Sequence, residues 1–150
     1  MKVYQLERKQ FLPISIEQAW NFFSIPSNLE KLTPEDILYN SGKREMYAGQ
    51  ILNYQISLFP GFNLHWTTEI THVKELDYFI DEQRFGPYKM WHHEHRFKEI
   101  EDGIIMEDTI NYVMPFAGIG RIVNSLFVEK QLNDIFDYRK VSVNNYIMKE

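Results

Sequence analysis

The chain has 150 residues and no cysteine, so its fold cannot depend on disulfides or on thiolate-bound zinc. Its net charge of -5 argues against a nucleic-acid partner, because binding to a phosphate backbone needs Lys and Arg gathered on one face. No stretch reaches the roughly 18 consecutive apolar residues of a membrane-spanning helix, and the charged, alternating N-terminal residues do not resemble a secretion signal. We therefore expect one domain, residues 1–150, in the cytoplasm, with a core that needs no cross-link.

The N-terminal part of the chain predicts one strand followed by two short helices. Residues 2–12 alternate polar and apolar side chains, as a half-buried strand does. Ser15 and Gln18 form the S-x-x-Q pattern of a capping box, which predicts a helix that ends before Pro26. Asn28, or the serine before it, is expected to cap a second short helix.

The middle of the chain predicts six strands separated by short turns that contain Gly, Pro or acidic residues. Because the connections are short, consecutive strands are expected to be antiparallel neighbours in one sheet. The predicted strands span residues 37–39, 50–58, 64–73, 78–85, 90–100 and 104–114.

A long helical pattern follows from about residue 119 to 147, which corresponds to a rod on the order of 40 Å. Its apolar residues occupy one face in the first half and roughly the opposite face in the second. A kink near Val128 would reconcile the two faces, and so would a first half that contacts a gate loop or a dimer partner. The second apolar face comprises Val128, Leu132, Ile135, Phe136, Val143 and Ile147. The charged residues expected on a solvated face are Glu129, Lys130, Asp134, Asp137, Arg139 and Lys140.

This order of elements predicts an α+β helix-grip fold, in which a curved antiparallel sheet of about seven strands wraps around a long C-terminal helix. One helix laid across a strongly curved sheet leaves a void between them. The 15% aromatic content suits a ligand cavity as well as a core. We therefore expect the void to hold a small, partly apolar molecule.

Polar side chains are predicted to face that void from three neighbouring strands. On residues 90–100 the charged face belongs in water, so His93 and His95 point inward between two aromatic residues. Asp108 lies alone among apolar residues on the inner face of the next strand, and Asp81 lies on the face of residues 78–85 that we assign inward because its ends are aromatic, at Phe79 and Phe85. The residues predicted to bind the ligand are Trp66, Thr68, Asp81, Gln83, Trp91, His93, His95, Phe97, Asp108 and Tyr112.

Several interpretations of the polar group remain open. The groups can satisfy one another as a buried network, or they can orient the polar end of a ligand while aromatic residues enclose the rest. His-x-His on one strand projects two imidazoles to the same side, and Asp81 or Asp108 could add an oxygen ligand for a metal. A His–Asp pair also permits acid–base chemistry. We assign no metal, no cofactor and no catalytic residue.

Four stretches of the sequence resemble the SRPBCC or START-like superfamily of helix-grip proteins, which includes the birch-pollen-allergen type and polyketide cyclases. They are most similar to its bacterial cyclase/dehydrase-like branch. The stretches are Phe79-Ile80-Asp81-Glu82-Gln83, Gly86-Pro87-Tyr88, Trp91-His92-His93-Glu94-His95-Arg96-Phe97, and Tyr112-Val113-Met114-Pro115-Phe116 with Gly118 and Gly120. The resemblance implies binding of lipids, polyketides or other hydrophobic molecules in the central cavity, and it implies neither catalysis nor its absence.

The sequence thus favours a protein that binds or carries a small hydrophobic molecule. The alternative is a cyclase/dehydratase- or hydrolase-like enzyme that uses the His and Asp residues of the cavity. A third possibility is an interaction module that uses the displaced apolar face of the long helix. The chain is expected to be a monomer or a homodimer.

Overall fold

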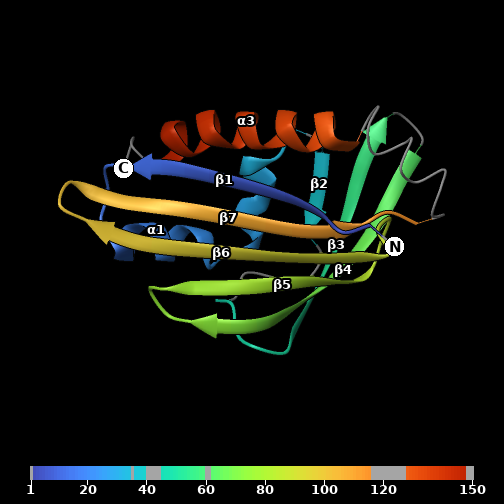
Figure 1. Cartoon of the computed structure of the whole chain (residues 1–150), viewed down its shortest axis with the longest axis horizontal. Helices are drawn as coiled ribbons and strands as arrows, with labels where there is room; N and C mark the ends of the chain where they lie inside the picture. The colour runs from blue at the N-terminus through green and yellow to red at the C-terminus, as the bar shows by residue number, and fades with distance from the viewer. Residues whose placement is uncertain (1, 35, 40–44, 60–61, 116–127, 148–150) are drawn as a thin grey trace.

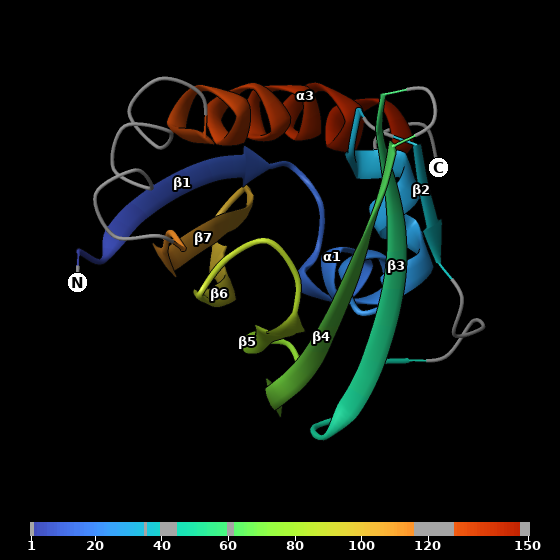
Figure 2. The same cartoon turned by 90° about the vertical axis from the view of Figure 1, so that its right-hand side faces the viewer.

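A seven-stranded antiparallel sheet curves around one long helix, α3, in the computed structural model of the chain. The strand order is β1-β7-β6-β5-β4-β3-β2, so the first strand and the short second strand form the two edges. Figure 2 shows the sheet nearly end-on as a cup, with α3 lying across its mouth between β1 and β2. The structure describes residues 2–34, 36–39, 45–59, 62–115 and 128–147.

The elements follow the predicted order (Figure 1). They are β1 (Tyr4–Leu12), α1 (Ile16–Phe23), the 3-10 helix η1 (Pro26–Leu32), β2 (Asp36–Tyr39), β3 (Gln50–Phe59), β4 (Phe62–Lys74), β5 (Tyr78–Phe85), β6 (Met90–Ile100), β7 (Gly103–Val113) and α3 (Glu129–Ile147). Each predicted strand forms, which confirms the expected α+β arrangement. The predicted turn at residues 60–61 and residues 119–127 of the predicted long helix lie outside the described residues, so the alternatives of a kink near Val128 or a first half that contacts a gate loop or a dimer partner stay predictions.

The two short helices begin for different reasons. At α1 the capping box is confirmed: the backbone N–H of Gln18 donates to the Ser15 hydroxyl, and the backbone N–H of Ser15 donates to the Gln18 side chain. The second helix is a 3-10 helix that starts at Pro26 and has no side-chain cap, so the expected cap at Asn28 or Ser27 is wrong. Proline lacks an N–H and has a helical φ, which lets it open a helix without a cap. The Asn28 amide instead donates to the Phe22 carbonyl oxygen at 2.7 Å.

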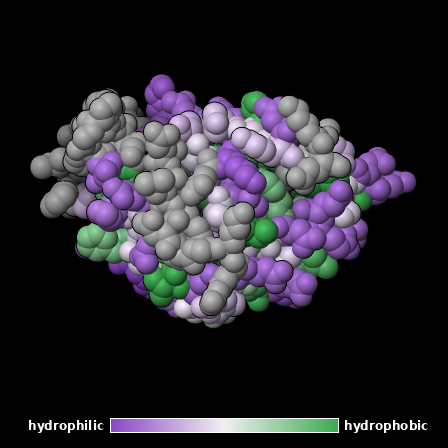
Figure 3. Space-filling model, turned by 180° about the vertical axis from the view of Figure 1, so that it is seen from behind, coloured by the Kyte–Doolittle hydropathy of each residue, from purple (hydrophilic) through white to green (hydrophobic). Residues whose placement is uncertain are grey.

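The end of the sheet beneath α1 is tightly packed. Apolar side chains from β1, α1, η1, β5, β6, β7 and α3 meet there, and we call this cluster the packed end. It comprises Leu12, Ala19, Trp20, Phe23, Leu32, Phe79, Phe97, Ile104, Met106 and Val143. On the face of the molecule seen in Figure 3, hydrophilic residues predominate among the coloured atoms and hydrophobic ones form small separate groups. Apolar area is therefore concentrated inside, between sheet and helix.

The inward face predicted for β5 is correct at one end of the strand and wrong at the other. Phe79 is buried in the packed end, whereas Phe85 is 67% exposed. The pairing of β4 with β5 shifts register between Thr67 and Thr68, so that Thr68 lies opposite Gln83 but Thr67 lies opposite Phe85. An extra residue in one strand reverses the alternation of side chains beyond it, which sends Phe85 to the solvent face.

The helices were also compared with the length and hydropathy of a membrane span. Among residues 2–34, 36–39, 45–59, 62–115 and 128–147, no helix is both long and apolar enough to cross a membrane.

Candidate functional site

Strands β5, β6 and β7 bring four titratable side chains together on the inner face of the sheet. Alternation along β6 buries His93 and His95 on the same side, as predicted. The register then places Asp81 of β5 directly opposite His93, and Asp108 of β7 directly opposite His95. We call these four residues the His/Asp cluster.

Each histidine of the cluster contacts both carboxylates. His93 Nε2 lies 2.9 Å from Asp108 Oδ1, and His95 Nε2 lies 3.0 Å from Asp81 Oδ2. These hydrogen bonds run diagonally between strands, since each carboxylate bonds to the histidine that is not directly opposite it. The second nitrogens are also near carboxylates: His93 Nδ1 is 3.5 Å from Asp81 Oδ2, and His95 Nδ1 is 2.9 Å from Asp108 Oδ1. The last contact is short, but its direction does not make a hydrogen bond, so His95 Nδ1 has no hydrogen-bond partner among the described residues.

The two histidines of the His/Asp cluster have pKa values that are shifted in opposite directions. Burial opposes the charged form of His95, but the carboxylates of Asp108 and Asp81 outweigh burial and raise its pKa. Burial and the adjacent His95 lower the pKa of His93 to about 4. The two imidazole centroids are only 3.7 Å apart, so a second positive charge beside the first is unfavourable.

Both carboxylates of the cluster stay ionised for the same reason. Burial alone would raise their pKa values, yet His95 and His93 hold the pKa of Asp81 below its ordinary value, and His93 and His95 do the same for Asp108. The hydroxyl of Thr68 on β4 adds a hydrogen bond to Asp81 Oδ1 at 3.3 Å. The cluster therefore consists of two ionised carboxylates around a pair of imidazoles, of which His95 binds a proton more readily than His93.

A cavity of about 330 Å³ lies beside the cluster, between the sheet and α3. This volume is at the lower end of the roughly 300–1,000 Å³ that is common for small-molecule sites. Most of its wall is aliphatic or aromatic. Contributions come from η1 (Leu29), β3 (Leu52, Tyr54, Ile56), β4 (Leu64, Trp66) and α3 (Leu132, Phe136). Asp81, His93 and His95 form a polar part of this wall, whereas Asp108 lies behind them.

A further charged residue, Arg139, reaches the cavity from α3. We expected Arg139 on a solvated helix face, and this is wrong: Arg139 is 9% exposed and lines the cavity. Its guanidinium lies over the Phe136 ring, 4.7 Å from the centroid, and its Nη1 is 4.0 Å from Asp108 Oδ1. The spacing of Leu132, Phe136, Arg139 and Val143 in steps of four, three and four residues places all four on one helix face, and this signal was sufficient to find Arg139.

The predicted ligand-binding residues divide into two groups. Six of them line the cavity: Trp66, Thr68, Asp81, Trp91, His93 and His95. The other four are placed elsewhere. Phe97 is buried in the packed end, Tyr112 stacks on Tyr4 at 5.4 Å, and Asp108 bonds to His93 from behind. The Gln83 amide exchanges two hydrogen bonds with the backbone of Tyr88, at 2.6 and 3.2 Å, and so fastens the turn between β5 and β6.

Asp81, His93 and His95 are the residues of the cluster that could together hold a metal ion, since one donor atom from each falls within 4.8 Å of the others. Two features of the site disfavour this use. The imidazole planes are inclined by only 36° at a centroid distance of 3.7 Å, so their in-plane lone pairs run side by side and do not converge on one point. The Nε2 atom of each histidine is also occupied by a hydrogen bond to a carboxylate of the cluster. The geometry supports an internal polar network more than a metal centre.

The fold and the site together define an α+β helix-grip protein with a mostly apolar cavity and a charged cluster in its wall. Comparisons with family models and with curated proteins find no match. Solved structures with the same architecture are found over almost the whole chain, and they include Ara h 8.0201, which has the birch-pollen-allergen-type fold. The helix-grip fold expected from the sequence is thereby confirmed.

Three of these structures illustrate the similarity. The protein TTHA0849 from Thermus thermophilus is 16% identical with a TM-score of 0.71, and the match covers 97% of this chain and 98% of that one. Ara h 8.0201 is 13% identical with a TM-score of 0.69, covering 99% and 100%. Major latex-like protein 151 from Panax ginseng is 12% identical with a TM-score of 0.70, covering 96% and 97%. Because these identities are low, the similarity establishes the fold and transfers neither a ligand nor an activity.

Proposed function

We propose that the protein binds a small, largely hydrophobic molecule, such as a lipid or a polyketide, in the cavity between the sheet and α3. The observation that carries the proposal is the cavity of about 330 Å³, whose wall is mostly aliphatic and aromatic with a few charged groups on one side. A wall of this composition gains free energy when an apolar molecule replaces water, while a few polar groups fix its orientation.

Residues of the cavity wall also explain why the chain leaves this space unfilled. The wall includes several large side chains, among them Trp66, Tyr88 and Trp91, which contact one another in edge or tilted geometry with centroids 4.8–5.6 Å apart. Rings held in this way support one another and cannot collapse freely into the space beside them. The cavity is therefore a built feature of this half of the protein.

The proposal is tested with the neutral apolar dye N-phenyl-1-naphthylamine, whose fluorescence rises when it leaves water. Ile56→Trp fills the cavity, because Ile56 lines it from β3. Ile51→Trp is the matched control, since Ile51 is on the same strand, is 47% exposed and is absent from the cavity wall.

We expect saturable dye binding to the wild-type protein and to Ile51→Trp, and a loss of at least about tenfold in affinity for Ile56→Trp, because the new indole occupies the dye's volume. Native mass spectrometry of the purified protein gives an independent readout through co-purified ligands. A wild-type protein that binds neither dye nor co-purified ligand, or two tryptophan variants that bind the dye equally, would show the proposal to be wrong.

A further inference from the structure

Arg139 is the charged residue of the cavity wall with the fewest partners. Its Nε is buried and makes no hydrogen bond within the described part of the chain, and its Nη1 is beyond hydrogen-bond distance of Asp108 Oδ1, at 4.0 Å. A guanidinium carries five N–H donors, and leaving them unsatisfied in an apolar environment is costly. Two arginines of the sheet, the exposed Arg84 and the half-buried Arg96, are better satisfied, since each contacts two carboxylates.

The carboxylates of the His/Asp cluster make no hydrogen bond to this guanidinium among the described residues, because they bond to the two histidines. The oxygens of Asp81 and Asp108 that face the cluster bond to His95 and His93, at 3.0 and 2.9 Å. Asp108 lies behind the cavity wall, whereas Arg139 is part of it. The guanidinium therefore borders the cavity, and its nearest counter-charge among the described residues, 4.0 Å away, is a carboxylate oxygen that already bonds to His93.

We infer that Arg139 binds the carboxylate of an amphipathic acid whose hydrocarbon part occupies the cavity. This deepens, and rests on, the proposed binding of a hydrophobic molecule. The planar fork of a guanidinium matches the two oxygens of a carboxylate, and such charge-assisted pairs are the stronger hydrogen bonds of proteins. The ring of Phe136 beneath the guanidinium fixes its plane.

The charges of the site select a single negative charge on the ligand. Arg139 supplies a positive charge, whereas the ionised carboxylates of Asp81 and Asp108 bring negative charge to the same region. A carboxylate adds one negative charge, placed next to Arg139 and away from Asp108. A phosphate monoester would bring close to two negative charges toward the same buried carboxylates, and this repulsion is strong where water is excluded.

The apolar wall fits the rest of such a molecule. From Arg139 the lining continues along α3 through Phe136 and Leu132, and across the cavity to Trp66 and Ile56. A chain or ring system attached to the acid would lie between the helix and strands β3 and β4. An acid anchored at its polar end and enclosed along its apolar part is thus the chemical class that the whole cavity fits.

The test compares two ligands that share a hydrocarbon chain, decanoic acid and decan-1-ol, as competitors of N-phenyl-1-naphthylamine at pH 7.5. It uses the wild-type protein, Arg139→Met, Arg139→Lys and the control Lys130→Met. Lys130 is on the same helix, and its side chain is 77% exposed. The control therefore removes a positive charge from α3 without touching the cavity.

In the wild-type protein we expect decanoate to compete about tenfold more strongly than decan-1-ol, as one charge-assisted hydrogen-bonded pair implies. Arg139→Met should weaken decanoate by about tenfold or more and leave decan-1-ol within about twofold, while Arg139→Lys keeps part of the preference because it keeps the charge. Lys130→Met should behave as wild type.

The inference is overturned if the acid and the alcohol compete equally in the wild-type protein, or if Arg139→Met binds the dye normally and retains the preference for the acid. In that case Arg139 serves only to balance the charge of Asp108. Either outcome leaves dye binding intact and is thereby distinct from failure of the proposed function, in which the dye itself does not bind.

Discussion

The two ends of the space beneath α3 are filled in different ways. At the packed end, α1 inserts Trp20 and Phe23 against Phe97, with ring centroids 5.8 and 5.6 Å apart. At the other end the strands face a cavity instead, and Phe23, Leu32 and Phe79 of the packed end form the part of the cavity wall where the two ends meet. In Figure 1, α1 lies behind one end of β7 and β6, whereas β3 and β4 rise at the other end.

Strand β6 contributes side chains to both ends. The difference between the packed end and the cavity therefore arises from the elements that cover the sheet and not from the sheet itself. Along β6, Phe97 belongs to the packed end and Trp91 to the cavity wall. His93 and His95 lie between them, and His95 stacks on Phe79 of the packed end with a centroid distance of 4.2 Å. The charged cluster therefore sits at the boundary, where packed side chains support it on one side and the cavity remains open to it on the other.

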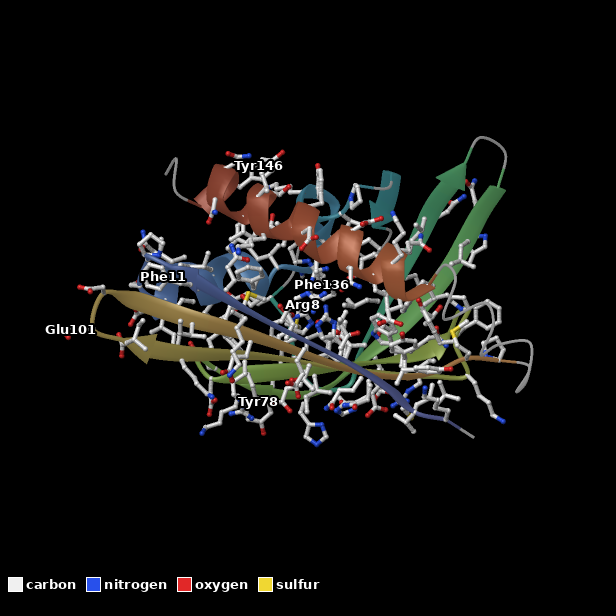
Figure 4. The ribbon with its side chains drawn as sticks, turned by 45° about the horizontal axis from the view of Figure 1, so that its top comes forward. Arg8, Phe11, Tyr78, Glu101, Phe136 and Tyr146 are labelled. Carbon is white, nitrogen blue, oxygen red and sulfur yellow. The ribbon has the colours of Figure 1, made fainter. Side chains whose placement is uncertain are left out.

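The side chains labelled in Figure 4 show how sharply this interior is separated from the surface. Phe136 lies beneath α3, between helix and sheet, whereas Tyr146 lies on the outer side of the helix and Tyr78 on the outer side of the sheet. Phe136 is buried and Tyr146 is exposed, in agreement with their positions. A ligand in the cavity is thus in contact with one face of α3 only.

Asp108→Asn should have the largest effect on stability, because it removes one of the two carboxylates that neutralise His95 and Arg139. Loss of one partner of a buried ion pair typically costs about 3–5 kcal/mol. Urea denaturation at pH 7 measures the change in the free energy of unfolding. The control Glu107→Gln alters the next residue, which bonds to Lys9 and Lys98 on the outer face, and should cost about 1 kcal/mol or less. Equal losses of stability for the two variants would contradict the assignment of Asp108 to a buried network of ion pairs in the His/Asp cluster.

Two Leu→Ala substitutions compare the ends directly. Leu12 is fully buried in the packed end, whereas Leu64 lines the cavity and is only partly buried. Leu12→Ala should destabilise the protein by about 2–5 kcal/mol, since it opens a new hole in close-packed surroundings. Leu64→Ala should cost about 1 kcal/mol, because the side chain it shortens already borders a void. Thermal and urea unfolding measure both. A Leu64→Ala loss as large as that of Leu12→Ala would mean that the cavity half is as tightly packed as the other.

Acidification should lower the free energy of unfolding through protonation of His93 in the His/Asp cluster. Its pKa is about 4 in the folded protein and near 6.5 when unfolded, so the unfolded chain binds the proton more readily and stability falls as the pH falls below 6.5. His95 has the opposite sign: its raised pKa contributes stability below 6.5 that is lost as the pH rises through the folded value. His93→Gln removes the first effect, so between pH 7 and 5 its stability should fall by about 2 kcal/mol less than that of the wild type. Urea denaturation curves recorded at several pH values give the free energy of unfolding of both proteins, and hence the slope of stability against pH for each. Parallel slopes would contradict a neutral, buried His93.

Most of the fold was predictable because the signals that define it are local. Alternation defined β6 without error, and the S-x-x-Q pattern placed the start of α1 at Ile16. The same alternation put His93 and His95 on the inner face, and their burial confirms it. Nothing in the strand patterns, however, gave the register, and the register decides which carboxylate meets which imidazole.

The residues that were misplaced were assigned from residue type or simple alternation, and each has a different structural reason for its actual place. Phe85 faces solvent because of a register shift against β4, which no property of β5 alone reveals. Arg139 was assigned to solvent because arginine is usually exposed, although its helical spacing placed it with Phe136. Gln83 was taken for a cavity residue, but the turn that follows it supplies its partners. Strand pairing, helical spacing and a local turn respectively overrode the assignment made from residue type or alternation.

The smallest predicted effect concerns the helix that makes the packed end. Ser15→Ala removes the hydroxyl that accepts from the Gln18 N–H, and loss of such a cap usually costs about 1 kcal/mol. Ser15→Asp retains an oxygen acceptor at the start of α1 and should stay within about 0.5 kcal/mol of wild type. Because the cap lies at the end of α1 opposite Phe23, which lines the cavity, dye affinity should be the same for both variants although their urea midpoints differ. If Ser15→Ala lowered dye affinity as well as stability, the two ends of the interior would be coupled through α1. The division between a packed end that provides stability and a cavity end that provides binding would then have to be abandoned.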